Sequence, residues 1–343
     1  MTFRAVLAGC GKMARGWTEA IARPELAGRV EIVGLVDVDL AAAERLRDEA
    51  GLDGIVTGTD LAAVLEATKP DFVFDVVIPG ARRNVVETAL LQGCHVLSEK
   101  PMAIAYEDAL ALEKLARETG RIFAVMQNRR YVEGVRRMRA MVDSGALGEL
   151  TALHVDFFIG AHFGGFREQM RNILMVDMAI HTFDAARFVA GRDAVAVYCH
   201  ETNPAGSWYA HGAAADAIFE LEDGVTFNYR GSWVAEGAPT SWDSSWRVVG
   251  SRGTLLWDGA DHFEAKVVEG GTGLVRPGTP VPVPPADPRQ TQEHASVIAA
   301  FVAACEQGTA PETVASDNLK SIAMVFGAIE SAKRGARLAL SEL

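Results

Sequence analysis

The sequence predicts an α/β fold in which an N-terminal doubly wound parallel sheet is followed by a C-terminal α/β domain with an open, mainly antiparallel sheet. In residues 1–125 short apolar runs alternate with amphipathic stretches, which is typical of parallel strands covered by helices on both faces. After about Gly148 apolar residues recur at every second position, which indicates strands with one buried and one exposed face. We therefore expect one domain over residues 1–125 and a second over residues 126–343.

The elements of the first domain are expected to alternate between strand and helix. Apolar runs predict buried strands at 4–9, 31–37, 71–78, 95–100 and 122–127, and amphipathic stretches predict helices at 40–50, 83–93 and 107–120. In the second domain, strands are expected within 150–159, 194–202, 214–233 and 246–257, with turns at 222–224 and 251–253. Helices are expected at about 173–189, 290–307 and 317–334, and a proline-rich surface loop at 275–288.

The composition narrows the class of function. The chain has 343 residues, of which 49% are hydrophobic and 23% charged, as in globular proteins. The net charge of −12 argues against a nucleic-acid partner, because a phosphate-binding face needs clustered Lys and Arg. The cysteines form no CxxC pair, so we expect a reducing cytoplasm and neither disulfides nor a metal site. No apolar run reaches about 18 residues and the N-terminus lacks the pattern of a signal peptide, so we expect no membrane association.

A glycine-rich turn follows the first predicted strand. Gly9, Gly11 and Ala14 have the spacing G-x-G-x-x-A, at the point where a strand ends and a helix begins. Gly9 permits the tight turn, and Gly11 lets a pyrophosphate approach the backbone at the positive end of the helix dipole. This context predicts a dinucleotide-binding Rossmann domain rather than a strand–turn–helix with small residues only for packing.

The end of the second strand indicates which dinucleotide binds. Asp37 lies where a carboxylate can accept hydrogen bonds from both adenosine ribose hydroxyls and repel a 2′-phosphate. Asp39 adds a second negative charge, and the first basic residue after it is Arg45. We therefore expect NAD as the cofactor rather than NADP.

Two charged residues close the strand predicted at 95–100. Ligands of such folds bind at the carboxyl ends of the parallel strands, so Glu99 and Lys100 are expected at the nicotinamide end of the cofactor site. Pro101 holds the preceding residue in an extended conformation and so sets the direction of the Lys100 side chain.

A second group of polar residues lies on the helix predicted at 173–189. Asp177 and His181 are four residues apart and so share one helix face, with Asp184 near it. A histidine beside a carboxylate is suited to general base catalysis near neutral pH, although a core histidine satisfied by its neighbour has the same pattern. The same spacing could suggest a metal site, but no third ligand is convincing and His154 and His162 are loose candidates only, so we expect no metal.

Several motifs occur in an order that resembles the Gfo/Idh/MocA oxidoreductase family, which includes glucose–fructose oxidoreductase and inositol dehydrogenases. They are "AGCGKMARG", "GLVDVD", "LLQGCHVLSEKPMA", "MQNRRY", "SGALGEL" and "DMAIHTFD", and the resemblance extends from residue 3 to the C-terminal helices. It implies a Rossmann domain, a domain with an open antiparallel sheet, and a catalytic set of Lys100, Asp177 and His181. Arg82 or Arg83 stands where the family often has a histidine, and Ala179 where many members have glycine.

The expected contacts follow from these motifs. Cofactor contacts are expected at Gly9, Gly11, Lys12, Met13, Asp37, Ile78, Pro79, Glu99, Lys100 and Asn128. Substrate contacts are expected at Lys100, Asn128, Arg167, Asp177 and His181.

We expect an NAD-dependent dehydrogenase that transfers hydride from a carbinol carbon to NAD. His181 is expected to take the hydroxyl proton, and Lys100 to bind the same oxygen, although Lys100 as the base is an open variant. Asp177 binds a second hydroxyl or orients His181, and Glu99 fixes Lys100 or its turn.

The resemblance implies a sugar or polyol substrate, with an aldose (a pentose or branched pentose) oxidised at C1 to a lactone as the first choice. An inositol or polyol dehydrogenase, an NAD-dependent glycosidase or dehydratase using transient oxidation, and a non-catalytic NAD-binding regulator stay open as alternative functions.

The loop 160–172 is expected to cover the substrate pocket. In this loop Arg167 either binds hydroxyls or a carboxylate of the substrate, or is a solvated surface residue. We interpret Trp233, Trp242 and Trp246 as core or interface residues rather than a sugar platform, in a homodimer or homotetramer formed through the C-terminal sheet.

Overall fold

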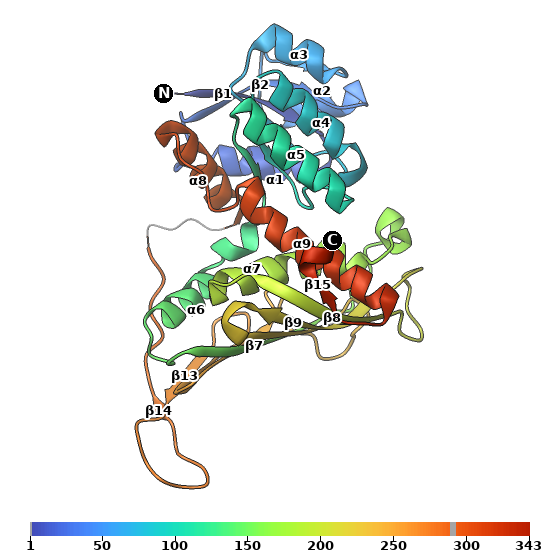
Figure 1. The fold of residues 1–343 in the computed structure, drawn as a ribbon. Helices are drawn as coiled ribbons and strands as arrows, with labels where there is room; N and C mark the ends of the chain where they lie inside the picture. Colours follow the sequence, from blue (N-terminus) through green and yellow to red (C-terminus); the bar gives the residue numbers. More distant parts are fainter. Residues whose placement is uncertain (1, 289–292) are drawn as a thin grey trace. The chain divides into compact units, whose positions relative to one another are not determined.

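The computed structural model describes residues 2–288 and 293–343, and it divides the chain into two compact units (Figure 1). The first unit comprises Met1–Asn128 with Thr291–Leu319, and the second comprises Arg129–Gln290 with Lys320–Leu343. The sequence analysis took each domain as one continuous segment, whereas the contacts group a C-terminal segment with the first unit. No helix in the described part of the chain combines the length and apolar character needed to cross a membrane.

The first unit contains a six-stranded parallel sheet with the order β3-β2-β1-β4-β5-β6. Its strands are β1 (Phe3–Ala8), β2 (Val30–Val36), β3 (Val56–Gly58), β4 (Phe72–Asp75), β5 (His95–Ser98) and β6 (Phe123–Val125). The strand order reverses at β1, and in folds of this kind ligands bind near that point, at the carboxyl ends of the strands. The doubly wound fold predicted from the sequence is confirmed.

Helices cover both faces of this sheet. They are α1 (Lys12–Ile21), α2 (Leu40–Glu49), α3 (Leu61–Thr68), α4 (Pro79–Leu91), α5 (Tyr106–Thr119) and α8 (Glu293–Gln307). Figure 1 shows α4 and α5 side by side on one face, while α1 packs beside α8 on the other. The helix predicted near 290–307 is thus present from Glu293, and residues 289–292 lie outside the described part.

The second unit contains a nine-stranded sheet with the order β14-β13-β12-β11-β7-β10-β9-β8-β15. Its strands are β7 (Leu150–Phe158), β8 (Ala194–Thr202), β9 (Ala214–Leu221), β10 (Thr226–Ser232), β11 (Ser245–Gly250), β12 (Gly253–Trp257), β13 (Phe263–Val267), β14 (Thr279–Pro280) and β15 (Leu338–Ala339). All neighbours pair antiparallel except β7 and β10, so the sheet is mixed and mainly antiparallel, as predicted.

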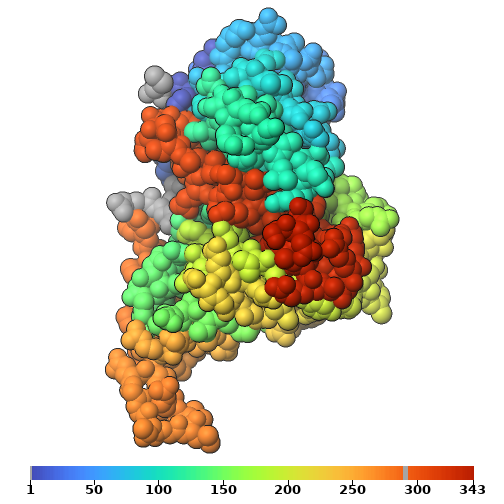
Figure 2. Space-filling view, in the orientation of Figure 1, coloured from blue at the N-terminus to red at the C-terminus, as the bar shows by residue number. Residues whose placement is uncertain are grey.

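Helices α6 (Glu133–Asp143) and α7 (Ile180–Ala190) cover one face of the second sheet, and α9 (Ala315–Arg334) packs against β8, where the Ser331 hydroxyl accepts a hydrogen bond from the Cys199 N–H at 3.0 Å (Figure 1). The other face is open, because β9 alternates buried and exposed residues along its length. The loop between β13 and β14, drawn in orange, projects from the sheet as an arm in Figures 1 and 2. Its residue Leu274 is fully exposed.

Candidate functional site

The glycine-rich turn of the first unit has the geometry that a dinucleotide needs. Gly9 has φ +95°, and a Cβ at this position would lie 2.6 Å from the backbone carbonyl carbon of Val76. Gly11 is the N-cap of α1 and makes no side-chain cap bond, and a Cβ there would meet no atom within 4 Å. The space beside Gly11 at the start of α1 is therefore open, and a pyrophosphate can approach the backbone there.

Asp37 lies directly after β2 and is tied to this turn. Its Oδ2 accepts a hydrogen bond from the Cys10 N–H at 2.7 Å, and its Oδ1 accepts one from the Asp39 N–H at 2.9 Å. A carboxylate offers about four acceptor positions, so Asp37 can still accept bonds from ribose hydroxyls. Asp39 instead caps α2 by accepting the Ala41 N–H at 3.1 Å. Of the two carboxylates, Asp37 is the one held beside the glycine-rich turn, and it is the candidate for a ribose contact.

Glu99 anchors the strand end that carries Lys100. Its Oε1 accepts the indole N–H of Trp17 at 2.9 Å and lies 3.4 Å from Nε2 of His294, while its Oε2 accepts the Lys100 backbone N–H at 3.2 Å. Burial alone would raise the pKa of Glu99, but the hydrogen bond and charge of His294, the Trp17 bond and the Lys100 charge together lower this pKa below its ordinary value. Glu99 is thus a charged anchor, in agreement with the expected role of fixing Lys100.

Arg82 contacts the chain directly after Lys100, on the side opposite Glu99 in the sequence. The Lys100–Pro101 peptide bond is cis, and the Pro101 carbonyl accepts a hydrogen bond from Nη1 of Arg82 at 2.6 Å. Arg82 also pairs with Asp75 at 3.0 Å, and both side chains are buried, at 1% and 0% exposure. Burial raises the pKa of Asp75, which Arg82 and the Ser98 hydroxyl oppose. The sequence analysis left the role of Arg82 open, and the structure shows it bracing the turn after Lys100.

Two further residues lie beyond the carboxyl end of β6. Gln127 is fully buried, and neither its Oε1 nor its Nε2 has a hydrogen-bond partner among the described residues. The Oδ1 atom of the predicted contact Asn128 is in the same situation. A buried polar atom without a partner costs about 1–3 kcal/mol, so these amides are suited to bind a ligand or water. Gln127 was missed by the sequence analysis, although it lies within the quoted "MQNRRY" motif.

The remaining expected cofactor contacts are at the starts of two helices. Lys12 begins α1, and Met13 beside it is 48% exposed. Pro79 begins α4, and the preceding Ile78 is 69% exposed. Apolar side chains left exposed at the carboxyl edge of the sheet fit contacts to a base or a nicotinamide ring. The residues of the first unit therefore fit bound NAD.

In the second unit, the helix predicted at 173–189 begins as a π-helix (Leu174–Ala179) and continues as α7. Asp177 lies in the π-helix with its side chain 17% exposed, and His181 lies in the first turn of α7 with 9% exposure. Such π-helical segments are rare in proteins, and those that occur are often found at functional sites. Asp184, one turn further on, is instead buried in the core. There it pairs with Arg130 and accepts a hydrogen bond from the Ser321 hydroxyl at 2.7 Å.

Arg167 joins the loop 160–172 to this helix. Its Nε lies 3.4 Å from Oδ2 of Asp177, which places the two predicted substrate residues together. The guanidinium carbon lies 5.2 Å and 5.3 Å from the ring centroids of Phe163 and Phe166. Arg167 is therefore not a solvated surface residue but the partner of a candidate catalytic carboxylate.

A small cavity of about 10 Å³ adjoins His181. Its wall includes His181, Trp242, and the ion pair between Arg129 and Asp243. A cavity of this volume can hold one water molecule, so His181 lies in a confined polar and aromatic setting. Trp233 and Trp246 are buried in the core as expected, whereas Trp242 is 47% exposed.

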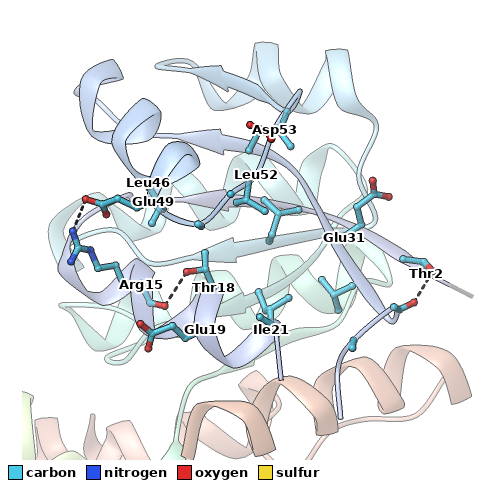
Figure 3. Close-up of a pocket in the computed structure, with 18 residues that line it drawn as sticks. Thr2, Arg15, Thr18, Glu19, Ile21, Glu31, Leu46, Glu49, Leu52 and Asp53 are labelled. Carbon is cyan, nitrogen blue, oxygen red and sulfur yellow. Dashed lines mark hydrogen bonds and ion pairs between the residues drawn. The ribbon is translucent and has the colours of Figure 1, made fainter. Parts of the chain in front are cut away.

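A larger hollow of about 920 Å³ lies elsewhere on the first unit (Figure 3). Glu31 and Ile32, at the beginning of β2, line it, and Arg15 pairs with Glu49 across it at 2.6 Å. The glycine-rich turn and Asp37 instead lie at the opposite, carboxyl ends of the strands. This hollow is therefore not the cofactor site.

The described residues form no group that could bind a metal ion, and the loose candidate His162 has other partners. His162 stacks on Trp208 at 3.7 Å between ring centroids and lies 3.0 Å from Glu236. Within residues 2–288 and 293–343, no three His, Cys, Asp or Glu side chains are grouped so that they could hold a metal ion.

The fold and the glycine-rich turn define the chain as a dinucleotide-binding oxidoreductase. An oxidoreductase family model with an NAD-binding Rossmann fold, Gfo/Idh/MocA, matches residues 3–127, and a Gfo/Idh/MocA C-terminal domain model matches residues 135–256. The chain belongs to the Gfo/Idh/MocA oxidoreductase family. The expected family, the enzyme class and NAD as the cofactor are confirmed.

Two relatives agree with this assignment, and a solved structure shares the fold. The chain is 29% identical to D-apiose dehydrogenase of Paraburkholderia graminis, over 99% of this chain and 90% of that protein. It is 30% identical to inositol 2-dehydrogenase of Streptomyces avermitilis, over 65% of this chain and 68% of that protein. The fold matches an Agrobacterium radiobacter oxidoreductase crystallised with NAD+, L-tartaric acid and magnesium, with a TM-score of 0.86 and 22% identity over 100% of this chain and 99% of that one.

Proposed function

We propose that the protein is an NAD-dependent aldose 1-dehydrogenase that converts a pentose or branched pentose to its lactone. The observation that carries this proposal is the placement of Asp177 and His181 in successive turns, with Arg167 on Asp177. A base beside hydrogen-bonding groups for neighbouring hydroxyls suits oxidation of a polyhydroxy compound. The likeness to D-apiose dehydrogenase supports a branched pentose, which is the class of sugar to which apiose belongs.

Each residue has a defined task in this reaction. NAD, when bound, supplies the acceptor for the hydride that leaves the carbinol carbon. His181 accepts the proton of the hydroxyl, and Lys100 donates a hydrogen bond to the same oxygen as negative charge develops on it. Asp177 accepts a hydrogen bond from a second hydroxyl, and the Arg167 Nε, 3.4 Å from its Oδ2, holds the carboxylate in place.

The main competing activity is oxidation of a cyclic or open-chain polyol, which the likeness to inositol 2-dehydrogenase supports. The same groups would act on a ring carbinol, and the product would be a ketone rather than a lactone. A glycosidase or dehydratase that uses transient oxidation would return the hydride within each turnover and release no net NADH.

The deciding experiment is to incubate the protein and NAD with D-apiose, D-xylose, L-arabinose, myo-inositol and xylitol, following NADH and identifying products by NMR. We expect NADH formation with at least one pentose and a lactone as the first product. Higher kcat/KM with myo-inositol or xylitol, and a ketone product, would contradict the aldose assignment. Elimination or hydrolysis without NADH would indicate the transient-oxidation class.

We further propose that the protein self-associates through the open face of the nine-stranded sheet. Tyr198 and Ile218 are cross-strand neighbours on β8 and β9, and they are 44% and 49% exposed. Apolar side chains paired on an open sheet favour burial against a second copy. Light scattering of wild type and Ile218→Glu tests this, and we expect a smaller assembly for the variant; equal masses would contradict it.

A further inference from the structure

A histidine from the C-terminal part of the chain reaches the strand end that carries Lys100. His294 lies in the first turn of α8, a helix that belongs to the first unit although most of the second unit precedes it in the sequence. This helix packs beside α1, which begins at the glycine-rich turn (Figure 1). Nε2 of His294 lies 3.4 Å from Oε1 of Glu99, and the histidine side chain is 22% exposed. An ionisable side chain from α8 is therefore one residue removed from a candidate catalytic lysine.

Glu99 links this histidine to the backbone of Lys100. Its Oε2 accepts the Lys100 backbone N–H at 3.2 Å, and its own N–H donates to the carbonyl of Asp75, at the end of β4, at 2.8 Å. The carboxylate thus binds the N–H of the residue that carries the ammonium group. A displacement of the carboxylate would therefore move the point from which the Lys100 side chain extends.

Two side chains hold the other carboxylate oxygen of Glu99. Trp17, which is fully buried, donates its indole N–H to Oε1 at 2.9 Å, and the His294 ring lies edge-on to Trp17 with 6.3 Å between centroids. Only the histidine of these two can add a positive charge. Burial alone would raise the pKa of Glu99, and the hydrogen bond and charge of His294 are the foremost causes that lower this pKa, ahead of the Trp17 bond. His294 is therefore the main electrostatic partner of Glu99.

We propose that His294 is a positioning residue for Lys100. It acts through Glu99, because the imidazole holds the carboxylate in place and the carboxylate fixes the backbone from which the Lys100 side chain extends. Helix α8 thereby contributes a residue to the support of the reacting groups in the first unit. The inference rests on the role that the proposed function gives to Lys100, but it does not depend on which sugar or polyol is oxidised.

The first test is kinetic and uses the compound of highest kcat/KM for NADH formation. His294→Leu removes the donor and the charge, so kcat should fall about tenfold or more through misplacement of Lys100, while the KM for NAD is unchanged. His294→Gln keeps an N–H donor and should lose less than His294→Leu. Gln307→Ala is the matched control, because Gln307 is an exposed residue at the other end of the same helix and its variant should behave as wild type. A lower melting temperature with unchanged kcat in His294→Leu would return His294 to a structural role.

A double-mutant cycle tests whether His294 acts through Glu99. Residues that act through one contact have non-additive effects. In a Glu99→Gln background, His294→Leu should therefore lower kcat by less than about twofold. The same tenfold fall in both backgrounds would overturn the proposed path through Glu99.

A further readout needs no substrate and separates this inference from the proposed function. The lysine amines are labelled by reductive ¹³C-methylation, and the NMR signal of Lys100 is identified by its loss in Lys100→Met. We expect this signal to shift in His294→Leu, to shift less in His294→Gln, and to stay in place in Gln307→Ala. An unshifted signal in both His294 variants would overturn the inference, and His294→Gln answers the question even if circular dichroism shows that His294→Leu is poorly folded. If wild type oxidised neither a pentose nor a polyol, the proposed function would fail, and this measurement would still decide whether His294 positions Lys100.

Discussion

Lys100 and His181 are supported in different ways in the two units. Lys100 follows a regular parallel strand, and both of its chain neighbours are tied to buried groups, Glu99 to Trp17 and Pro101 to Arg82. His181 follows a π-helix whose Asp177 pairs with an arginine from a surface loop. In the first unit, the residues on both sides of Lys100 are hydrogen-bonded to buried side chains, whereas in the second unit Asp177 pairs with Arg167, whose side chain is partly exposed.

The largest effect on turnover is expected from substitution of Lys100. Lys100→Met nearly conserves side-chain length but removes the ammonium that stabilises the developing alkoxide, so turnover should fall by about 10³-fold or more. The variant should remain folded and bind NAD, as isothermal titration calorimetry can establish. A variant with near-normal kcat would remove Lys100 from the reaction and leave only its structural position.

Arg82→Met tests the buried ion pair between Arg82 and Asp75 in the first unit. Removing one partner of a buried ion pair leaves the Asp75 carboxylate uncompensated, so the free energy of unfolding should fall by about 3–5 kcal/mol. Arg83→Met is the matched control, because Arg83 is 48% exposed and its substitution should lower the free energy of unfolding far less. Urea unfolding measures the free energy of unfolding of both variants. An equal loss in the two variants would contradict a stabilising role for the buried Arg82–Asp75 pair.

Cofactor selection depends on Asp37. We expect wild type to prefer NAD over NADP by at least about tenfold in kcat/KM, which corresponds to about 1.4 kcal/mol. Asp37→Ala should reduce this preference without abolishing turnover, because the ribose hydrogen bonds are lost but the phosphate-binding turn remains. Initial rates with both cofactors measure it, and equal efficiency in wild type would refute the ribose–carboxylate argument.

A smaller, pH-dependent effect is expected at Glu99. Its pKa is lowered in the folded state, so its charge stabilises the fold above the ordinary pKa of about 4.5, and this contribution is lost as the pH falls below that value. Glu99→Gln should therefore reduce the free energy of unfolding by about 1 kcal/mol at pH 7, and the difference from wild type should shrink below pH ~4.5. Denaturant titrations at several pH values check this; a difference that grows as the pH falls would have the wrong sign.

The two units also differ in how far the sequence predicted them. Gly9, Asp37 and Lys100 could be singled out from the sequence because each lies at the end of a predicted strand, and strand ends follow from local apolar runs. The role of Arg82 was not predictable, since its contact with Pro101 joins residues 19 positions apart through the folded sheet. His294 was missed for the same reason, because α8 returns to the first unit from the far end of the chain.

In the second unit the sequence analysis singled out Asp177 and His181 as candidates, but it did not predict the contacts that surround them. The four-residue spacing of Asp177 and His181 is compatible with an α-helix, so nothing in the periodicity distinguishes the π-helix that the structure shows. The pairing of Arg167 with Asp177 depends on how the loop 160–172 folds back. Trp242 lies between β10 and β11 and is 47% exposed, whereas Trp233, directly after β10, and Trp246, on β11, are buried.

The most direct test of the account is the pH dependence of pentose oxidation in wild type and in His181→Ala. If His181 is the general base, kcat/KM in wild type should rise across about pH 6–7, where an imidazole loses its proton, and then level off. His181→Ala should lower kcat by about 10²–10⁴-fold and lose this rise, while its affinity for NAD is unchanged. A variant that keeps the same pH profile and a near-normal kcat would contradict the account and return His181 to a structural role.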